Sequence, residues 1–332
     1  MGATGSGKSS FINLMSASSL SVGEGLKSCT SSIQLGQTFE LDNSQVTLVD
    51  TPGFDDTTVS DTDILKMISG YLASAYQGGI KLSGVIYMHR ISDVRVGGIS
   101  RRNFGMFRKL CGDDSLKNVI IVTNMWGEVS KEKGIAREEE LKTDDLLFKP
   151  VLEKGAKLMR HYNTVQSATL ILRQLLDNHP QALQLQRELV DERKDITQTE
   201  AGLELDREMA AQIAKHEQQM AEIREEMKEA IDRKDLDAKA ELEEVRHELE
   251  EKTQQLALDR ERVSSGYAAE KAKADESMRD LRVALEVGRQ DHQDEIKRLM
   301  KLMETNVELI KGEREKMQRR IHQLEHPPCT IQ

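Results

Sequence analysis

The sequence predicts an α/β domain followed by a long α-helical coiled coil. A glycine-rich loop with a phosphate-binding pattern stands at residues 2–9. Short apolar segments then alternate with segments of helical spacing, which predicts a mostly parallel sheet with ligands bound at the carboxyl ends of its strands. From residue 180 onward the chain is highly charged and almost free of proline, which is typical of long helices.

The distribution of charge separates these two parts. Residues 1–179 hold 20 Lys and Arg against 20 Asp and Glu, whereas the remaining residues hold 27 against 37, so the net charge of −10 lies in the second part. We therefore predict a globular domain at 1–179, a coiled coil at 180–326 and a tail at 327–332. General nucleic-acid binding is not expected of an acidic chain, because it requires a basic surface. No apolar run reaches the roughly 18 residues of a membrane span.

The cysteines indicate the compartment. Cys29, Cys111 and Cys329 are odd in number and far apart, so they form neither a disulfide framework nor a metal-binding spacing. Free cysteines are typical of a reducing environment, and a cytoplasmic protein is expected.

The first element is a loop with the pattern G-x-x-x-x-G-K-[ST]. Its glycines lack a Cβ, so the backbone can bend tightly and point successive N–H groups at phosphate oxygens. Lys8 would bring a positive charge to the β- and γ-phosphates, and Ser9 would offer its hydroxyl to Mg²⁺. The apolar spacing after Ser10 predicts a helix whose positive N-terminus faces the anion. The expected nucleotide-binding residues of this motif are Gly2, Thr4, Gly5, Ser6, Gly7, Lys8, Ser9 and Ser10.

A phosphate loop normally follows a buried strand, yet this loop begins at the second residue. We expect the central first strand of the sheet to be missing from this chain. Three explanations of the missing strand are possible: a misassigned start codon, a sequence that is a fragment, or a natural product that lacks the strand. The first two explanations are favoured, because an empty central position would leave the neighbouring strand edges exposed.

The next elements form a hairpin that leads to a second phosphate-site motif. Residues 33–41 and 45–49 have strand character and are separated by the turn residues Asp42-Asn43-Ser44. The second strand ends at Asp50, which would hold the magnesium shell, and Gly53 would approach the γ-phosphate with its backbone N–H.

A polar loop lies between the first helix and the hairpin. Thr30 in this loop is our candidate for a further metal contact and a catalytic role beside Lys8, because such a threonine can order when a triphosphate is bound. An ordinary polar loop is an almost equally good interpretation.

The remaining elements of the domain continue the alternation of strands and helices. Strands are predicted at 82–88 and 119–123, and helices at 61–76, 101–110, 134–160 (with a break at Pro150) and 169–176.

The joint pattern of Gly2–Ser9, Thr30 and Asp50–Asp56 resembles the G domains of translation-factor-related GTPases. It looks most similar to the septin-like and immunity-associated GTPases and to fungal proteins that carry DTPGFDDT. The resemblance covers residues 1–179. It implies a Ras-like, doubly wound P-loop domain that binds GTP with Mg²⁺.

Two positions depart from the pattern of these families. The base-reading motif should read [NT]-K-x-D, but the chain has Asn124-Met125-Trp126-Gly127. Asn124 can occupy the first position, whereas the carboxylate that binds guanine is absent, and the adjacent Glu128 is a candidate substitute for it. Ser167-Ala168 match the second base-contacting loop, where a backbone N–H would meet the guanine oxygen. Phe54 replaces the water-orienting Gln and cannot bind water, so hydrolysis is expected to be slow or dependent on dimerisation or a partner.

The second part of the chain has no proline between Pro180 and Pro327. Apolar residues recur there every seven positions, which indicates a left-handed coiled coil and self-association into a homodimer or larger assembly. A charged single helix or a partly disordered tail is the alternative. The recurring residues are Leu189, Ile196, Leu203 and Ala210, then Ile213, Met220 and Met227, and later Ile296, Met303, Ile310 and Met317.

The last four residues, Cys329-Thr330-Ile331-Gln332, match the C-a-a-X pattern, with Gln at X indicating farnesylation. Basic residues between 311 and 320 could add the second signal that membrane binding requires. The alternative is a chance terminal cysteine. A lipid on Cys329 would tether the protein to the cytoplasmic face of a membrane.

Three functions are compatible with these features. The favoured one is a nucleotide-dependent switch or assembly GTPase whose tail serves oligomerisation. The second is a structural coiled-coil protein with a degenerate nucleotide domain, favoured by the absent base-reading Asp. A chromosome-type ATPase is a weaker third, because nothing in the chain resembles its signature segment.

Overall fold

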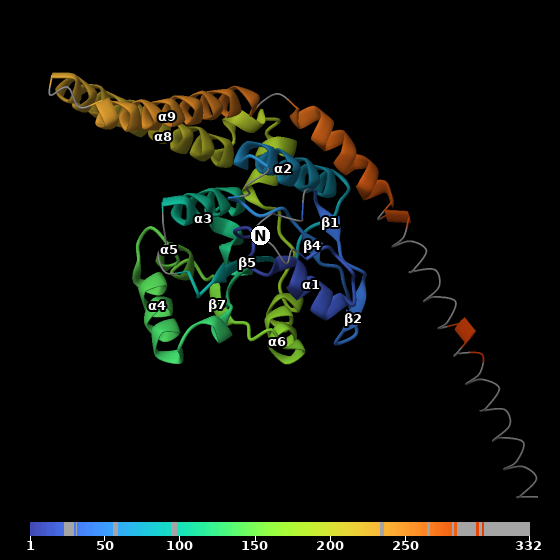
Figure 1. Cartoon of the computed structure of the whole chain (residues 1–332). Helices are drawn as coiled ribbons and strands as arrows, with labels where there is room; N and C mark the ends of the chain where they lie inside the picture. Colours follow the sequence, from blue (N-terminus) through green and yellow to red (C-terminus); the bar gives the residue numbers. More distant parts are fainter. Residues whose placement is uncertain are drawn as a thin grey trace, which may run out of the picture. The chain divides into compact units, whose positions relative to one another are not determined.

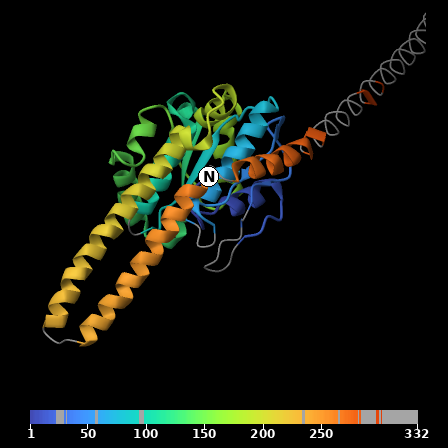
Figure 2. The same ribbon diagram turned by 90° about the horizontal axis from the view of Figure 1, so that it is seen from above.

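The computed structural model describes residues 1–22, 30, 32–55, 59–93, 98–232, 236–263, 266–280, 282–283, 297–298 and 301. The chain divides into two compact units, Met1–Glu276 and Ser277–Gln332, so the predicted boundary at 179/180 falls inside the first unit. Cys329 and the last heptads lie outside the described residues. The helices and strands of the first unit are shown in Figures 1 and 2.

A parallel three-stranded sheet forms the centre of the first unit, in the order β5, β6, β7. Its strands are β5 (Val85–Arg90), β6 (Val119–Asn124) and β7 (Lys157–Arg160). Met1 and the first residue of the phosphate loop lie beside β5, because Gly2 bridges Met88 in parallel and the Met88 N–H donates to the Met1 carbonyl at 2.9 Å.

Strand β7 corrects the prediction that residues 134–160 are mostly helical. Helix α4 (Lys131–Thr143) is followed by a four-residue helix, α5 (Lys149–Leu152), which has Pro150 in its first turn. Gly155 then adopts φ +97°, a conformation that favours glycine, and the chain turns into β7. A strand of four residues is too short to show a clear period in the sequence.

Two small antiparallel ladders precede this sheet. Strand β2 (Phe39–Leu41) pairs with β3 (Ser44–Val46), and β1 (Gln34–Leu35) pairs with β4 (Val49–Asp50). The predicted hairpin is therefore confirmed, although each of its long strands is divided in two.

Helices cover both faces of the sheet, as the doubly wound prediction requires (Figure 1). On one face, α1 (Lys8–Ser16) and α6 (Val165–Leu176) pack against inward residues of β5 and β6. On the other face, Tyr87 of β5 contacts Phe104 and Phe107 of α3 (Gly98–Cys111), with ring centroids 5.1 and 4.7 Å apart. Helix α2 (Asp61–Gln77) follows the second phosphate-site motif. The buried residues on the face covered by α1 and α6 are Phe11, Met88, Ile120, Val122, Ala168, Ile171, Leu172 and Leu175.

The described residues between 180 and 262 form several separate helical segments. Helix α7 (Gln184–Gln186), a π-helix at Arg187–Asp191 and a 3-10 turn at Ile196–Gln198 come first, and Ile196 is fully buried. Helices α8 (Glu200–Asp232) and α9 (Leu236–Arg262) then run side by side in opposite directions (Figures 1 and 2).

Contacts between the two helices fix their antiparallel pairing. Arg260, near the end of α9, forms an ion pair with Asp206, near the start of α8. Further along, the Thr253 hydroxyl lies 3.4 Å from His216 Nδ1. Helices α8 and α9 therefore pair with each other within one chain. Closing the short loop between two consecutive helices costs little conformational entropy. Of the predicted core positions, Met227 is buried but Leu203 is 52% exposed, so the heptad pattern does not describe one continuous seam.

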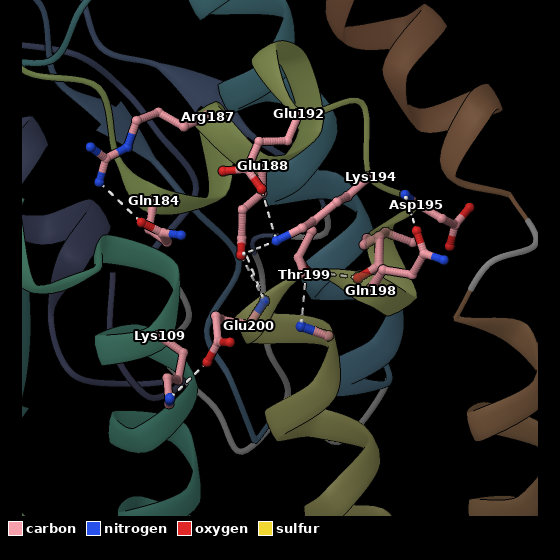
Figure 3. A network of polar contacts seen from close by, with 12 residues as sticks. Lys109, Gln184, Arg187, Glu188, Glu192, Lys194, Asp195, Gln198, Thr199 and Glu200 are labelled. Carbon is pink, nitrogen blue, oxygen red and sulfur yellow. Dashed lines mark hydrogen bonds and ion pairs between the residues drawn. The ribbon is translucent and has the colours of Figure 1, made fainter.

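A polar network fixes the start of α8 to α3 (Figure 3). Glu188 of the π-helix is only 1% exposed and accepts hydrogen bonds from Lys194 Nζ at 3.3 Å and from the Glu200 N–H at 3.2 Å. Lys109 Nζ of α3 donates to Glu200 Oε2 at 2.8 Å. The Thr199 hydroxyl accepts from the Gly202 N–H at 3.1 Å and so caps the helix. A buried, fully paired carboxylate of this kind makes the junction rigid.

None of the helices in the described ranges combines the length and the apolar character needed to cross a membrane.

Candidate functional site

The phosphate loop has the backbone that its glycines predict. Gly2, Gly5 and Gly7 adopt φ values of +136°, +74° and +91°, and a Cβ on Gly2 would lie 2.3 Å from the Met88 carbonyl oxygen. Lys8 Nζ donates to the carbonyls of Gly2 at 3.2 Å and Ala3 at 2.9 Å. The lysine therefore reaches back across the loop, which places its charge at the beginning of the loop.

Three oxygen-bearing side chains meet beside the loop. Ser9 Oγ of α1 donates to Asp50 Oδ2 of β4 at 2.5 Å and lies 3.3 Å from Thr30 Oγ1. Asp50 is fully buried, yet its Oδ1 has no hydrogen-bond partner in the described part of the chain. A buried carboxylate oxygen without a partner is suited to bind a cation, and oxygen is the ligand that Mg²⁺ prefers.

The charge of this group limits how it could hold a metal. It contains one carboxylate, and no group of three His, Cys, Asp or Glu side chains that could hold a metal ion occurs among the described residues. Mg²⁺ is commonly held by one or two carboxylates together with substrate phosphates and water. Ser9, Thr30 and Asp50 therefore fit a magnesium ion that arrives with a phosphate ligand.

The segment after Asp50 closes one end of the loop. The Thr4 N–H donates to the Phe54 carbonyl at 2.9 Å, and Thr4 Oγ1 donates to the Gly53 carbonyl at 3.2 Å. A Cβ on Gly53 would lie 2.5 Å from Thr4 Cα, so only glycine allows this approach. The Phe54 side chain is fully buried and is not presented to a water molecule in the site.

A cavity of about 650 Å³ lies at the other end of the loop. Asn124 at its edge donates through Nδ2 to the Ser6 carbonyl at 3.2 Å, so this residue supports the loop. A Cβ on Gly127 would have no atom within 4 Å, which means that the position of the absent Asp is open space. The lining residues are Gly7, Ser10, Asn124, Met125, Trp126, Gly127, Glu128, Val129, Lys131, Arg160, His161, Tyr162 and Asn163.

Aromatic and basic side chains form one wall of this cavity. The Arg160 guanidinium lies 4.3 Å from the centre of the Trp126 ring, and the Tyr162 ring lies 6.1 Å from it. Glu138 accepts hydrogen bonds from Arg160 Nε at 3.0 Å and from Nη2 at 2.5 Å, and this pairing raises the pKa of Arg160. The wall therefore offers two aromatic rings, tilted by 51° to each other, and a guanidinium held in place by Glu138, and a planar ring can stack on such groups.

The structure corrects the prediction for Ser167 and Ala168. Both lie within α6, and Ala168 is fully buried in the core. Ser167 lies behind the cavity, where its Oγ is 2.9 Å from His161 Nδ1 and accepts from the Tyr162 N–H at 3.2 Å. The loop after β7, residues 161–163, lines the cavity in their place. Sequence reasoning missed this loop because it predicts helix, not strand, for the four residues of β7 that precede it.

The comparison with protein families agrees with this geometry. Residues 1–125 match the family model described as 50S ribosome-binding GTPase. Residues 1–125 therefore carry the sequence features of a P-loop GTPase domain. The matched range contains the phosphate loop, Thr30, Asp50 and Gly53, and it ends at Met125, one of the residues that line the cavity. No curated protein resembles the chain closely enough to count as a relative.

Solved structures give a weaker comparison of the GTPase domain. A dimerization-deficient mutant of Toc33 from Arabidopsis thaliana has 13% identity over 53% of this chain and 81% of that chain, with a TM-score of 0.43. Toc33 in complex with GDP and Mg²⁺ has 14% identity over the same shares, with a TM-score of 0.42. Toc33 with Mg²⁺ and GMPPNP has 17% identity over 50% and 70%, with a TM-score of 0.37. Similarity at this level carries no conclusion about function.

Proposed function

We propose that this protein is a GTP-binding switch in which the GTPase domain controls the helical hairpin formed by α8 and α9. The observation that carries this proposal is the meeting of Ser9, Thr30 and Asp50 beside Lys8, with Asp50 Oδ1 left without a partner among the described residues. Three separate segments supply these groups, and a purely structural domain would have no need to bury an unpaired carboxylate oxygen there.

Different groups of the site would bind different parts of Mg²⁺-GTP. Backbone N–H groups of Gly5 and of residues 7–10 would hold the phosphates, and Lys8 would exchange its carbonyl partners for phosphate oxygens. Ser9 and Thr30 would bind the metal, with Asp50 holding its shell. When bound, Mg²⁺ neutralises the charge on the β- and γ-phosphates.

Guanine rather than adenine is proposed as the base because of Glu128. This residue lines the cavity next to Gly127, where the expected Asp is absent. A carboxylate there can accept the two hydrogen bonds that guanine N1 and N2 donate, whereas adenine presents no such pair of donors on that edge. Trp126 and Tyr162 would flank the ring.

The coupling to the hairpin runs through α2, which directly follows the γ-phosphate segment. The Asp55 N–H donates to Asp61 Oδ1 at 3.0 Å at the start of this helix. One residue later, Thr62 Oγ1 donates to the Asp259 carbonyl of α9 at 3.3 Å and contacts Met209 Sδ of α8 at 3.9 Å. A change of the segment around Gly53 would therefore move the helix on which the hairpin rests.

Hydrolysis is proposed to be slow or dependent on assembly, because Phe54 cannot orient water. We propose that contacts between paired GTPase domains assist the hydrolysis that Phe54 cannot assist. Self-association through the tail, a cytoplasmic location and lipid attachment at Cys329 stay predictions. A structural protein with a degenerate nucleotide domain is the alternative function.

Titration with fluorescent GTP and ATP analogues tests the proposal. Wild type is expected to bind the GTP analogue in the presence of Mg²⁺, and Lys8→Ala is expected to lose at least about tenfold in affinity because a charge-assisted contact is worth about 1.5–3 kcal/mol. Lys142→Ala, which removes a surface lysine of α4 paired with Glu139, is the matched control and should bind normally.

A Glu128→Ala variant separates the two bases. It is expected to lose affinity for GTP and to keep its affinity for ATP. Equal affinities of wild type and Lys8→Ala would support the structural alternative.

A further inference from the structure

Arg90 is the last residue of β5 and pairs in register with Asn124 of β6. The carboxyl ends of parallel strands lie at one edge of the sheet, which is also the edge of the phosphate loop. A Cβ built on Gly5 would lie 3.2 Å from Arg90 Nη1. The guanidinium therefore occupies the open side of Gly5, a placement that no motif in the sequence indicates.

The contacts of the loop show which end of a bound nucleotide Arg90 would meet. Thr4 contacts Gly53, the residue proposed to approach the γ-phosphate, and Gly5 directly follows Thr4. The later loop residue Gly7 lines the cavity proposed for the base. Arg90 thus stands at the β- and γ-phosphate end, beside Gly5.

An ion pair holds the Arg90 side chain in place but leaves hydrogen-bond donors of its guanidinium available. Its Nε lies 3.0 Å from Asp93 Oδ1, and the side chain is 34% exposed. The Nε–H is not aligned with an acceptor and is buried without a hydrogen bond among the described residues. Asp93 therefore directs the guanidinium toward the loop and leaves it able to donate to an anion.

We propose that Arg90 is a catalytic residue that donates hydrogen bonds to the β–γ end of bound GTP. This inference rests on the proposed function. In hydrolysis a water oxygen bonds to the γ-phosphorus, and the bond to the β–γ bridging oxygen breaks. The electron pair of that bond stays on the GDP oxygen, while one water proton remains on the phosphate product and the other passes to solvent. Arg90 stabilises the negative charge that develops on the GDP oxygen.

Arg90 would supply part of the transition-state stabilisation in a site where Phe54 cannot orient the attacking water. A guanidinium supplied within the same chain stabilises the transition state without orienting the attacking water. Arginine is always charged at physiological pH and presents a planar fork of donors, whereas lysine offers only a point charge. The expected activity is therefore slow but measurable, and its rate depends on the guanidinium.

The test compares hydrolysis with binding in the full chain. Single-turnover GTP hydrolysis and the affinities for GDP and GMPPNP are measured for wild type, Arg90→Ala and Arg90→Lys. Arg173→Ala is the control, because Arg173 lies on α6 and forms an exposed ion pair with Asp42. Arg90→Ala is expected to slow hydrolysis about 100-fold while its GDP affinity stays within about threefold of wild type. Arg90→Lys should recover part of the rate, and Arg173→Ala should match wild type.

Binding of GDP with aluminium fluoride provides a second measurement, because this complex imitates the charge of the transition state. Wild type should form it and Arg90→Ala should not. Hydrolysis by Arg90→Ala at the wild-type rate overturns the inference. It is also overturned if Arg90→Ala weakens GDP and GMPPNP equally while bound GTP is hydrolysed normally, since Arg90 would then only support the loop. Failure of wild type to bind GTP or GMPPNP would instead refute the proposed function, and this inference with it.

Discussion

The substitution Gly202→Ala tests the junction between the GTPase domain and α8. Gly202 lies in the first turn of this helix, where alanine is normally more stable than glycine by about 1 kcal/mol. In this protein, however, a Cβ at residue 202 would lie 2.0 Å from the Ile196 carbonyl oxygen and 3.0 Å from its carbon. These are backbone atoms that cannot rotate away. Helix propensity therefore predicts that alanine raises the free energy of unfolding, whereas the contact with Ile196 predicts that it lowers it.

We expect the unfavourable contact with Ile196 to outweigh the gain in helix propensity. Overpacking by one methyl group costs about 1–3 kcal/mol, and here it would also disturb the Thr199 cap. A net loss of about 2 kcal/mol is expected, which corresponds to a lower Tm by about 4–8 °C for a unit of this size. Urea unfolding followed by circular dichroism measures the change.

Gly105→Ala is the matched control for this prediction. Gly105 lies in α3, and its added Cβ would lie 3.2 Å from Glu204 Oε1, the far end of a flexible side chain. This variant should be neutral or slightly more stable. If Gly202→Ala were as stable as Gly105→Ala, the described packing of α8 against residues 196–199 would be wrong.

Two further predictions concern pH and the coupling of the hairpin. Burial lowers the pKa of His89 to about 4, opposed by Asp93 and assisted by Arg90. The unfolded chain binds the proton more readily, so stability should fall as pH drops from about 6.5 to about 4, by up to about 3 kcal/mol. Urea unfolding across this range should show a weaker acid dependence for His89→Leu, and an unchanged dependence would contradict the burial. Thr62→Val removes the hydrogen bond to α9, so hydrogen exchange in α9 should become less sensitive to nucleotide, whereas nucleotide affinity should stay close to that of wild type; an unchanged sensitivity would refute the coupling.

The sequence alone determined the phosphate loop, α1 and the Asp50–Gly53 segment. In each of these the chemistry and the backbone conformation are encoded in a few contiguous residues. Glycines permit the positive φ values of the loop, and the lysine and serine follow at fixed spacing. The absence of the base-reading Asp was equally plain, since it concerns one position in a short motif.

Only the tertiary structure decided which distant residues complete the site. Arg90 reaches Gly5 because β5 and the loop end at the same edge of the sheet, and residues 161–163 reach the cavity because a strand of four residues precedes them. The folding of residues 200–262 into an antiparallel hairpin was likewise not determined by heptad spacing. An apolar stripe requires a partner, but its period does not say whether that partner is a second chain or the next helix of the same chain.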